Sequence, residues 1–326
     1  MSLDSDVIVD RRSIRRKLTF WRVAAALVAI AAIVTVAVIA TPGGRGAMTT
    51  SGSIARVKIE GLIRSDNDRV EALERLEKSL AAAVVVHINS PGGTTAGSEQ
   101  LYDALARLKA KKPLVVVVEG LAASGGYIAA IAADHIVAQQ TSLVGSIGVL
   151  FQYPNFTDLM KTVGVKVEEV KSSPLKAAPN GFEPTSPEAR AALESLVKDS
   201  YAWFRGLVKN RRGMDDAQLD IAADGRVFTG RQAVDLKLID ELGDEKTAIA
   251  WLVAQKNVKS DLPVRDFKLA PRFGDLTFLR TAASITLDAL GLSTVARRIE
   301  QAGVAQAVDR LSLDGMLALW QPAGVN

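Results

Sequence analysis

Two stretches of the sequence contain residue types that together can carry out nucleophilic catalysis. Ser124 is the one serine in "LVVVVEGLAASGGYIAAIAAD" (114–134), where a run of apolar residues gives way to Ala and Gly. Lys176 follows fifty-two positions later in "SSPLKAAPNGFEP", and no other charged residue lies between Lys171 and Glu183. A serine hydroxyl needs a base to take its proton, and a lysine amine that is held away from water can be that base.

Each of these residues also has a simpler interpretation. Ser124 stands where a helix begins, so it can be an N-cap residue. Lys176 can be an exposed lysine of a loop. Other lysines are weaker candidates, because those at 109, 111 and 112 form a charged helix end, and those at 166 and 171 belong to a charged strand-like segment.

A third stretch supplies groups that can stabilise a negative charge. "INSPGG" (88–93) follows an apolar run, and its Pro and two Gly residues predict a tight turn with free backbone N–H groups. Such N–H groups can form an oxyanion hole, and so can the N–H of Gly125 at the start of the predicted helix. Pro-Gly-Gly turns are common, so this stretch indicates an oxyanion hole only in combination with Ser124.

The composition excludes several other chemistries. The chain of 326 residues has no cysteine, which removes thiolate nucleophiles, disulfides and cysteine-ligated zinc. Its two histidines, His87 and His135, lie in apolar strand-like runs and are interpreted as structural. The net charge of +4 is local: residues 1–22 hold six basic and three acidic side chains, so the rest carries +1. We therefore expect no nucleic-acid partner.

The segment 23–40, "VAAALVAIAAIVTVAVIA", predicts a transmembrane anchor. Its eighteen residues carry no charge, and a helix of that length spans about 27 Å. A basic cluster precedes it, which predicts a cytoplasmic N-terminus and a domain outside the cytoplasmic membrane. A cleaved signal peptide is the alternative. The Gly- and Ser-rich residues 41–53 then read as a flexible linker.

From residue 54 onward, apolar β-type runs alternate with amphipathic helical patterns. "IARVKIEGLI", "VVVHI" and "PLVVVVEG" predict strands, and helix-period segments separate them. "VKVEEVK" (165–171) is also expected to be a strand, and Ser186-Pro187 predicts the start of a long helix. This alternation indicates an α/β domain with a mostly parallel sheet covered on both faces.

Five motifs taken in order resemble the bacterial signal peptide peptidases of the Ser-Lys type, the protease IV family, in its short form with a single module. They are "INSPGG", "GLAASGGYIAAIAAD", "TSLVGSIGV", "VKSSPLK" and "ADGRVFTGRQAVDLKLIDELG". The resemblance implies a crotonase/Clp-protease-like fold of stacked ββα units. It makes Ser124 the nucleophile, Lys176 the general base and Ser146 the hydroxyl that positions the lysine. Gly93 and Gly125 become oxyanion donors, and no metal or cofactor is implied.

The resemblance also implies a domain plan and partners. We expect a cytoplasmic tail (1–22), the anchor (23–40), the linker (41–53), a peptidase domain (54–262) and a helical extension (263–326) to which no role is assigned. The protein would cleave remnant signal peptides at the outer face of the bacterial cytoplasmic membrane. It would contact the bilayer through residues 23–40, and it would form a homo-oligomeric ring whose protomers share the Ser-Lys dyad.

Three alternatives stay open at this stage. A crotonase-type acyl-CoA hydratase or isomerase uses similar paired N–H groups, but the anchor would keep the domain away from coenzyme A. A non-catalytic membrane scaffold on the same fold would be expected to have lost Ser124 or Lys176, and both are present. A related peptidase that cuts one specific membrane protein fits the same motifs.

Overall fold

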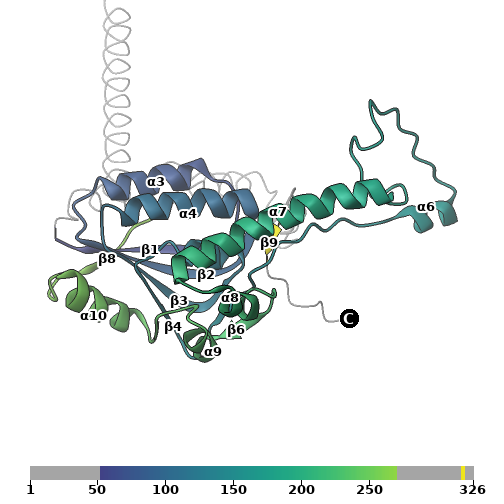
Figure 1. Cartoon of the computed structure of the whole chain (residues 1–326). Helices are drawn as coiled ribbons and strands as arrows, with labels where there is room; N and C mark the ends of the chain where they lie inside the picture. The colour runs from purple at the N-terminus through teal and green to yellow at the C-terminus, as the bar shows by residue number, and fades with distance from the viewer. Residues whose placement is uncertain (1–51, 270–316, 320–326) are drawn as a thin grey trace, which may run out of the picture. The chain divides into compact units, whose positions relative to one another are not determined.

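The structure is a computed structural model that describes residues 52–269 and 317–319 (Figure 1). Its helices and strands are, in chain order, β1 (Ile54–Ile63), α3 (Asn67–Glu77), β2 (Ala83–Thr94), α4 (Thr95–Lys109), β3 (Leu114–Ala123), α5 (Gly125–Ala130), β4 (His135–Ala138), β5 (Leu143–Gly145), α6 (Thr157–Val163), α7 (Pro187–Arg212), α8 (Asp216–Ala222), β6 (Val227–Thr229), α9 (Gly230–Asp235), β7 (Glu241–Leu242), α10 (Glu245–Lys256), β8 (Val264–Asp266) and β9 (Leu317–Leu319).

These strands form one mixed sheet with the order β6-β5-β3-β2-β1-β8. The central strands β1, β2 and β3 are parallel, as the continuous apolar runs predict. Along the same edge of β3, residues 115–118 pair with β4 and residues 121–123 pair with β5; β7 in turn pairs with β4. Two short strands run antiparallel to their neighbours, namely β6 beside β5 and β9 beside β2. The parallel centre places the carboxyl ends of β2 and β3 at the same edge of the sheet.

Alternate side chains of the central strands fill two separate cores. In β2, Val84, Val86 and Ile88 belong to the larger core, which also contains residues of the neighbouring strands and of α3, α4, α5 and α7. Val85 points to the opposite face and packs with residues of α10 such as Leu252. Figure 1 shows α3 and α4 on one side of the sheet and α10 on the other. Both faces of the parallel strands are therefore buried, and the strand ends are held firmly.

The chain leaves this layered body between β5 and α7. Residues 151–186 contain one short helix, α6, and otherwise irregular backbone; we call them the arm. Figure 1 shows the arm reaching beyond the sheet, alongside the first part of α7. The predicted strand at 165–171 is wrong: none of the described strands pairs with this segment, and Val170 is fully exposed. The predicted start of α7 is confirmed, since the Ser186 hydroxyl caps the helix and Pro187 is its first residue.

The predicted anchor at 23–40 and most of the helical extension lie outside the described residues. Within the ranges that the structure describes, no helix is both long enough and apolar enough to cross a bilayer. The membrane anchor therefore stays a prediction from the sequence.

Candidate active site

Ser124 occupies the sharp turn between β3 and α5. Its backbone has φ 54° and ψ −116°, a conformation that costs a non-glycine residue about 1–3 kcal/mol. The residue is 1% exposed, and although it stands at the N-cap position its side chain makes no capping hydrogen bond. The helix-cap interpretation therefore fails, and the strained turn leaves the hydroxyl available for another role.

The turn after β5 lies directly beside this serine. Strands β3 and β5 pair through Ala123 and Gly145, and the Ser124 N–H donates to the Gly145 carbonyl at 2.7 Å. Ser146 follows at once, is 7% exposed and also has a positive φ of 51°. Its own N–H donates to the Arg226 carbonyl at 2.8 Å, which fixes this turn against the "GRVFTG" segment. The structure thus brings Ser124 and Ser146 to adjacent turns at one edge of the sheet.

The Pro-Gly-Gly turn at the end of β2 has two glycines with different surroundings. Gly92 has φ 100°, and its N–H donates to the Ser90 hydroxyl at 3.1 Å. That hydroxyl donates in turn to the Gly61 carbonyl at 2.7 Å. A Cβ on Gly93 would lie 1.8 Å from the Ile63 carbonyl oxygen, so only glycine fits there. Because the Gly92 N–H is engaged, Gly93 is the better oxyanion donor of the pair.

Close backbone packing joins this turn to the Ser124 turn. Ser90 pairs with Ala122 of β3. A Cβ on Gly126 would lie 2.6 Å from the Ser90 carbonyl oxygen, so α5 starts in direct contact with the end of β2. Gly125, the residue between Ser124 and Gly126, is the first residue of α5 and is buried. Four of the five predicted site residues, Gly93, Ser124, Gly125 and Ser146, therefore gather at one edge of the sheet.

Lys176 is the fifth, and it does not join them within one chain. It lies in the arm, between α6 and α7, and its side chain is exposed. Among the described residues, the ammonium group of Lys176 has no hydrogen-bond or ion-pair partner. The backbone N–H of Lys176 donates to the Ser173 carbonyl at 3.1 Å. Within one chain, Lys176 therefore has the exposed loop position that its simpler interpretation predicts.

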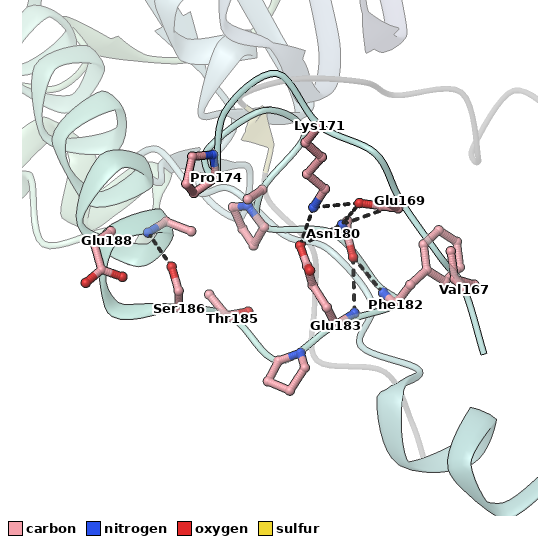
Figure 2. Close-up of a pocket in the computed structure, with 14 residues that line it drawn as sticks. Val167, Glu169, Lys171, Pro174, Asn180, Phe182, Glu183, Thr185, Ser186 and Glu188 are labelled. Carbon is pink, nitrogen blue, oxygen red and sulfur yellow. Dashed lines mark hydrogen bonds and ion pairs between the residues drawn. The ribbon is translucent and has the colours of Figure 1, made fainter. Parts of the chain in front are cut away.

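Lys171 lies on the same arm in a polar pocket and is a poor candidate for a base (Figure 2). Its ammonium group contacts the carboxylates of Glu169 and Glu183, each at 2.6 Å. These two bonds raise the pKa of Lys171, so its charged form is favoured and its amine has no free lone pair. Asn180 also donates to Glu183 at 3.0 Å. The pocket has a volume of about 450 Å³, and Ser124 is not among its lining residues.

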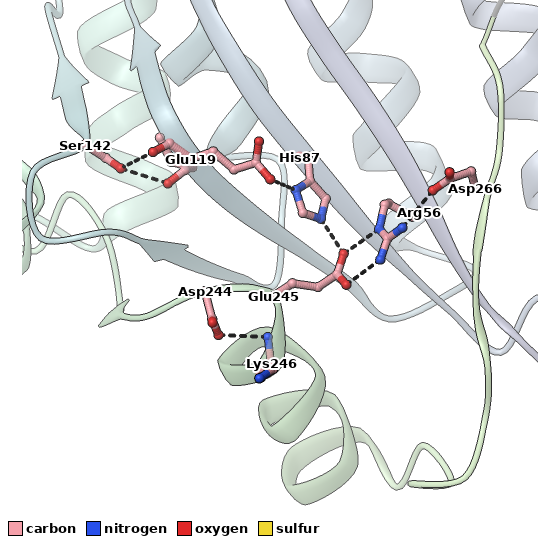
Figure 3. A network of polar contacts seen from close by, with 9 residues as sticks. Arg56, His87, Glu119, Ser142, Asp244, Glu245, Lys246 and Asp266 are labelled. Atoms are coloured by element: carbon pink, nitrogen blue, oxygen red, sulfur yellow. Dashed lines mark hydrogen bonds and ion pairs between the residues drawn. The ribbon is translucent and has the colours of Figure 1, made fainter.

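A network of charged side chains joins the central strands β1, β2 and β3 to α10 (Figure 3). His87 of β2 contacts Glu119 of β3 through Nδ1 at 2.7 Å and Glu245 of α10 through Nε2 at 2.6 Å. Arg56 of β1 donates to both oxygens of Glu245 at 2.5 Å. These bonds raise the pKa of Arg56 and lower that of Glu245. With both ring nitrogens facing carboxylates, His87 is engaged in structure and is not free to be a catalytic base.

The other histidine is similarly engaged in a structural contact. His135 stacks on Trp251 of α10 with ring centroids 4.5 Å apart, and its Nε2 lies 3.3 Å from a carboxylate oxygen of Glu241. The prediction that both histidines are structural fits these contacts.

Comparison with known proteins gives the class of this chain. The model of peptidase family S49 matches residues 106–259, and that of the Clp protease family matches residues 64–143. A protein of Synechocystis sp. that carries a protease name is 34% identical over 215 residues, which are 65% of this chain and 78% of that protein. A protein of Enterococcus faecium named as a signal peptide peptidase is 30% identical over 198 residues, covering 60% of this chain and 57% of its own length.

Among solved structures, the membrane-bound stomatin-specific protease 1510-N, in a mutant form, aligns with 68% of this chain and 99% of its own. Its sequence identity is 16% and its TM-score 0.43. The protein belongs to peptidase family S49, and it has a Clp-protease-like fold with a mixed α/β sheet. By class it is a serine endopeptidase.

Proposed function

We propose that Ser124 is the nucleophile of this peptidase and that Lys176 is its general base. The observation that carries the proposal is the turn of Ser124, which is buried, strained and free of the capping bond that a structural serine would make there. Strain of this kind is maintained where the surrounding structure over-determines a functional residue. The pairing of Ala123 with Gly145 and the contact between Gly126 and Ser90 provide that surrounding structure.

The proposed reaction starts with a neutral Lys176 amine, which takes the proton of the Ser124 hydroxyl. The serine oxygen then attacks the carbonyl carbon of a peptide bond, and the N–H groups of Gly93 and Gly125 stabilise the oxyanion. The lysine ammonium gives its proton to the leaving amine, and water hydrolyses the acyl-enzyme. Ser146, beside Ser124, would hold the lysine amine in place through its hydroxyl.

In this proposal the lysine reaches the serine from a neighbouring protomer. Within one chain Lys176 is exposed on the arm, while Ser124 lies at the end of β3. The arm also exposes apolar side chains that a monomer would leave in water, among them Leu159 (61% exposed), Val163 (62%) and Phe182 (50%). Burying such side chains against a second copy would stabilise an oligomer and desolvate the lysine.

The substrates that we propose are remnant signal peptides and other apolar peptides at the outer face of the cytoplasmic membrane. The anchor predicted at 23–40 would hold the peptidase where such peptides lie, and the name of the Enterococcus faecium relative points to the same substrate class. An alternative substrate is one specific membrane protein. A crotonase-type activity has less support, because such chemistry gives no role to the strained Ser124.

Cleavage of a synthetic apolar signal peptide by purified full-length protein tests the proposal. Ser124→Ala and Lys176→Ala are each expected to lower kcat/KM at least about a thousandfold, since dyad members act as a unit. Ser172→Ala and Lys166→Ala are matched controls, because both residues are exposed on the same arm. The proposal fails if Lys176→Ala keeps near-normal activity at neutral pH while the protein stays folded and assembled.

A further inference from the structure

The carboxyl end of β2 has one edge that faces the candidate nucleophile. A strand has two hydrogen-bonding edges, and β1 occupies one of them, with an irregularity between Glu60 and Leu62, as far as the pair Ile63 and Gly93. The other edge pairs with β3 up to Ser90 and Ala122. Beyond Ser90 the chain of β3 turns away through Ser124 into α5. The segment 92–94 therefore presents a free edge beside the Ser124 turn.

The strand β9 occupies this edge. It runs antiparallel to β2 and pairs Leu317 with Thr94, Ala318 with Gly93 and Leu319 with Gly92. Because β1 already holds the opposite edge, β9 takes the place that β3 vacates, on the side of Ser124. The candidate oxyanion glycine, Gly93, thus lies directly opposite Ala318.

We infer that this edge is a strand-docking site, and that the C-terminal segment around residues 317–319 of the same chain occupies it in competition with the substrate. A peptide that is to be cut must lie extended with its carbonyl near the oxyanion donors, and strand addition is the usual way to hold it there. The inference rests on the proposed function, because it takes Ser124 and Gly93 as the reacting centre.

The sequence of the segment matches the chemistry of the proposed substrates. The last charged residue of the chain is Asp314, and "GMLALWQPAGVN" (315–326) has no charge. Its paired part is Leu-Ala-Leu, with a small residue between two apolar ones. An apolar signal peptide has the same character, so the site would accept either segment by the same backbone contacts.

A cysteine cross-link tests whether the segment docks where the structure places it. The chain has no cysteine, so Thr94→Cys with Leu317→Cys creates a single possible pair. Opposed residues of an antiparallel ladder are about 4.5–5.5 Å apart at Cα, within disulfide range. We expect rapid oxidation to a cross-link inside one chain in the full-length protein. Thr94→Cys with Val325→Cys is the control, and it keeps the same change at Thr94.

The outcome separates the possible occupants. A cross-link within the chain that forms faster than in the control supports the inference. A cross-link between two chains would show that a second copy supplies the strand, and it would overturn the assignment to the chain's own segment. Equal rates in both variants would overturn the docking itself.

Kinetics test the competition. Neighbouring N–H groups of a strand point to opposite edges, so replacing Ala318 and Leu319 together by Pro removes a ladder bond in either register. A tethered competitor acts at roughly millimolar effective concentration, so we expect KM for an apolar peptide to fall about two- to tenfold. Gly324→Pro with Val325→Pro is the matched control. An unchanged KM in the Ala318, Leu319 variant would overturn the competition.

Labelling of Ser124 by a fluorophosphonate in the same samples separates this inference from the proposed function. If wild type and the Pro variant both fail to label at Ser124, the proposed nucleophile is wrong. If both label at the same rate, Ser124 is the nucleophile but the C-terminal segment does not compete with the substrate. Faster labelling of the Pro variant is the result that supports both.

Discussion

At the residue scale, the site depends on glycines that let two backbone turns touch. Gly126 is the clearest case, because a Cβ there would lie 2.6 Å from the Ser90 carbonyl oxygen, and a backbone atom cannot move away cheaply. The contact couples the start of α5 to the end of β2, and through them Ser124 to Gly93. Geometry that is off by about 1 Å at a catalytic centre can cost about a hundredfold in rate.

We therefore expect Gly126→Ala to lower kcat/KM at least about tenfold, and to lower the free energy of unfolding by about 1–3 kcal/mol through overpacking. Gly206→Ala is the control, because a Cβ at that position of α7 meets nothing within 4 Å. It should leave cleavage unchanged and stabilise the helix slightly, since alanine is the better helix former. Equal activity in the two variants would show that the contact is not needed.

Another residue-scale prediction concerns Tyr127 of α5. The side chain is fully buried, and its hydroxyl donates to the Leu238 carbonyl at 2.8 Å. Burial raises the pKa of this hydroxyl, so it stays protonated and able to donate. Tyr127→Phe leaves a buried carbonyl without its donor and should cost about 1–3 kcal/mol of unfolding free energy in urea titrations. A loss near zero would mean that the carbonyl finds another donor.

At the element scale, the network of Arg56, His87, Glu119 and Glu245 ties three strands to α10. The pKa of Glu245 is lowered, chiefly by its hydrogen bonds to Arg56, so its carboxylate favours the folded state when ionised. The contribution is complete above the ordinary pKa of a glutamate and is lost as the pH falls through the lowered value. Acid should therefore weaken this attachment of α10.

Glu245→Gln tests this linkage. We expect the variant to lose about 2 kcal/mol of unfolding free energy at neutral pH, and the gap to wild type to shrink below about pH 4. Glu194→Gln is the matched control, since Glu194 pairs with Arg190 on an exposed face of α7 and should change little. A gap that stays constant with pH would mean that the charge of Glu245 does not stabilise the fold.

Much of the architecture at this scale could be predicted from the sequence. Buried parallel strands, the two turns and the long helix after Ser186 all have clear local patterns. "VKVEEVK" (165–171) also has a strand-like alternation, yet it forms no strand. A strand needs a neighbouring strand to pair with, and the sequence does not reveal whether there is one. Sequence patterns also could not predict the pairing of β9 with β2 or the contacts among Arg56, His87 and Glu245, since these contacts join positions that are far apart in the chain.

At the scale of the whole molecule, the arm decides whether one chain can be active. The resemblance to the Ser-Lys peptidases predicted that Ser124, Gly93, Gly125 and Ser146 belong to one site, and the structure brings them to one edge of the sheet. It leaves Lys176 exposed on the arm. Spacing alone carries no information on which protomer completes a site, so only the resemblance to a ring-forming family predicted that two protomers share the dyad.

Mixing two inactive variants tests whether protomers share the dyad. If serine and lysine come from different chains, randomly mixed Ser124→Ala and Lys176→Ala protomers should regain about one quarter of wild-type activity, because that fraction of the sites in a closed ring receives both native residues. Each variant alone and a mixture prepared without subunit exchange are the controls. No recovery in verified mixed oligomers would place the base within the same chain or at another residue.

The most direct test of the central claim is covalent labelling of the nucleophile. Full-length protein treated with a fluorescent fluorophosphonate should carry the label on the peptide that contains Ser124. The label should be absent in Ser124→Ala and strongly reduced in Lys176→Ala, because the base activates the serine. A label on any other residue, or none on a folded and assembled protein, would contradict the assignment of Ser124.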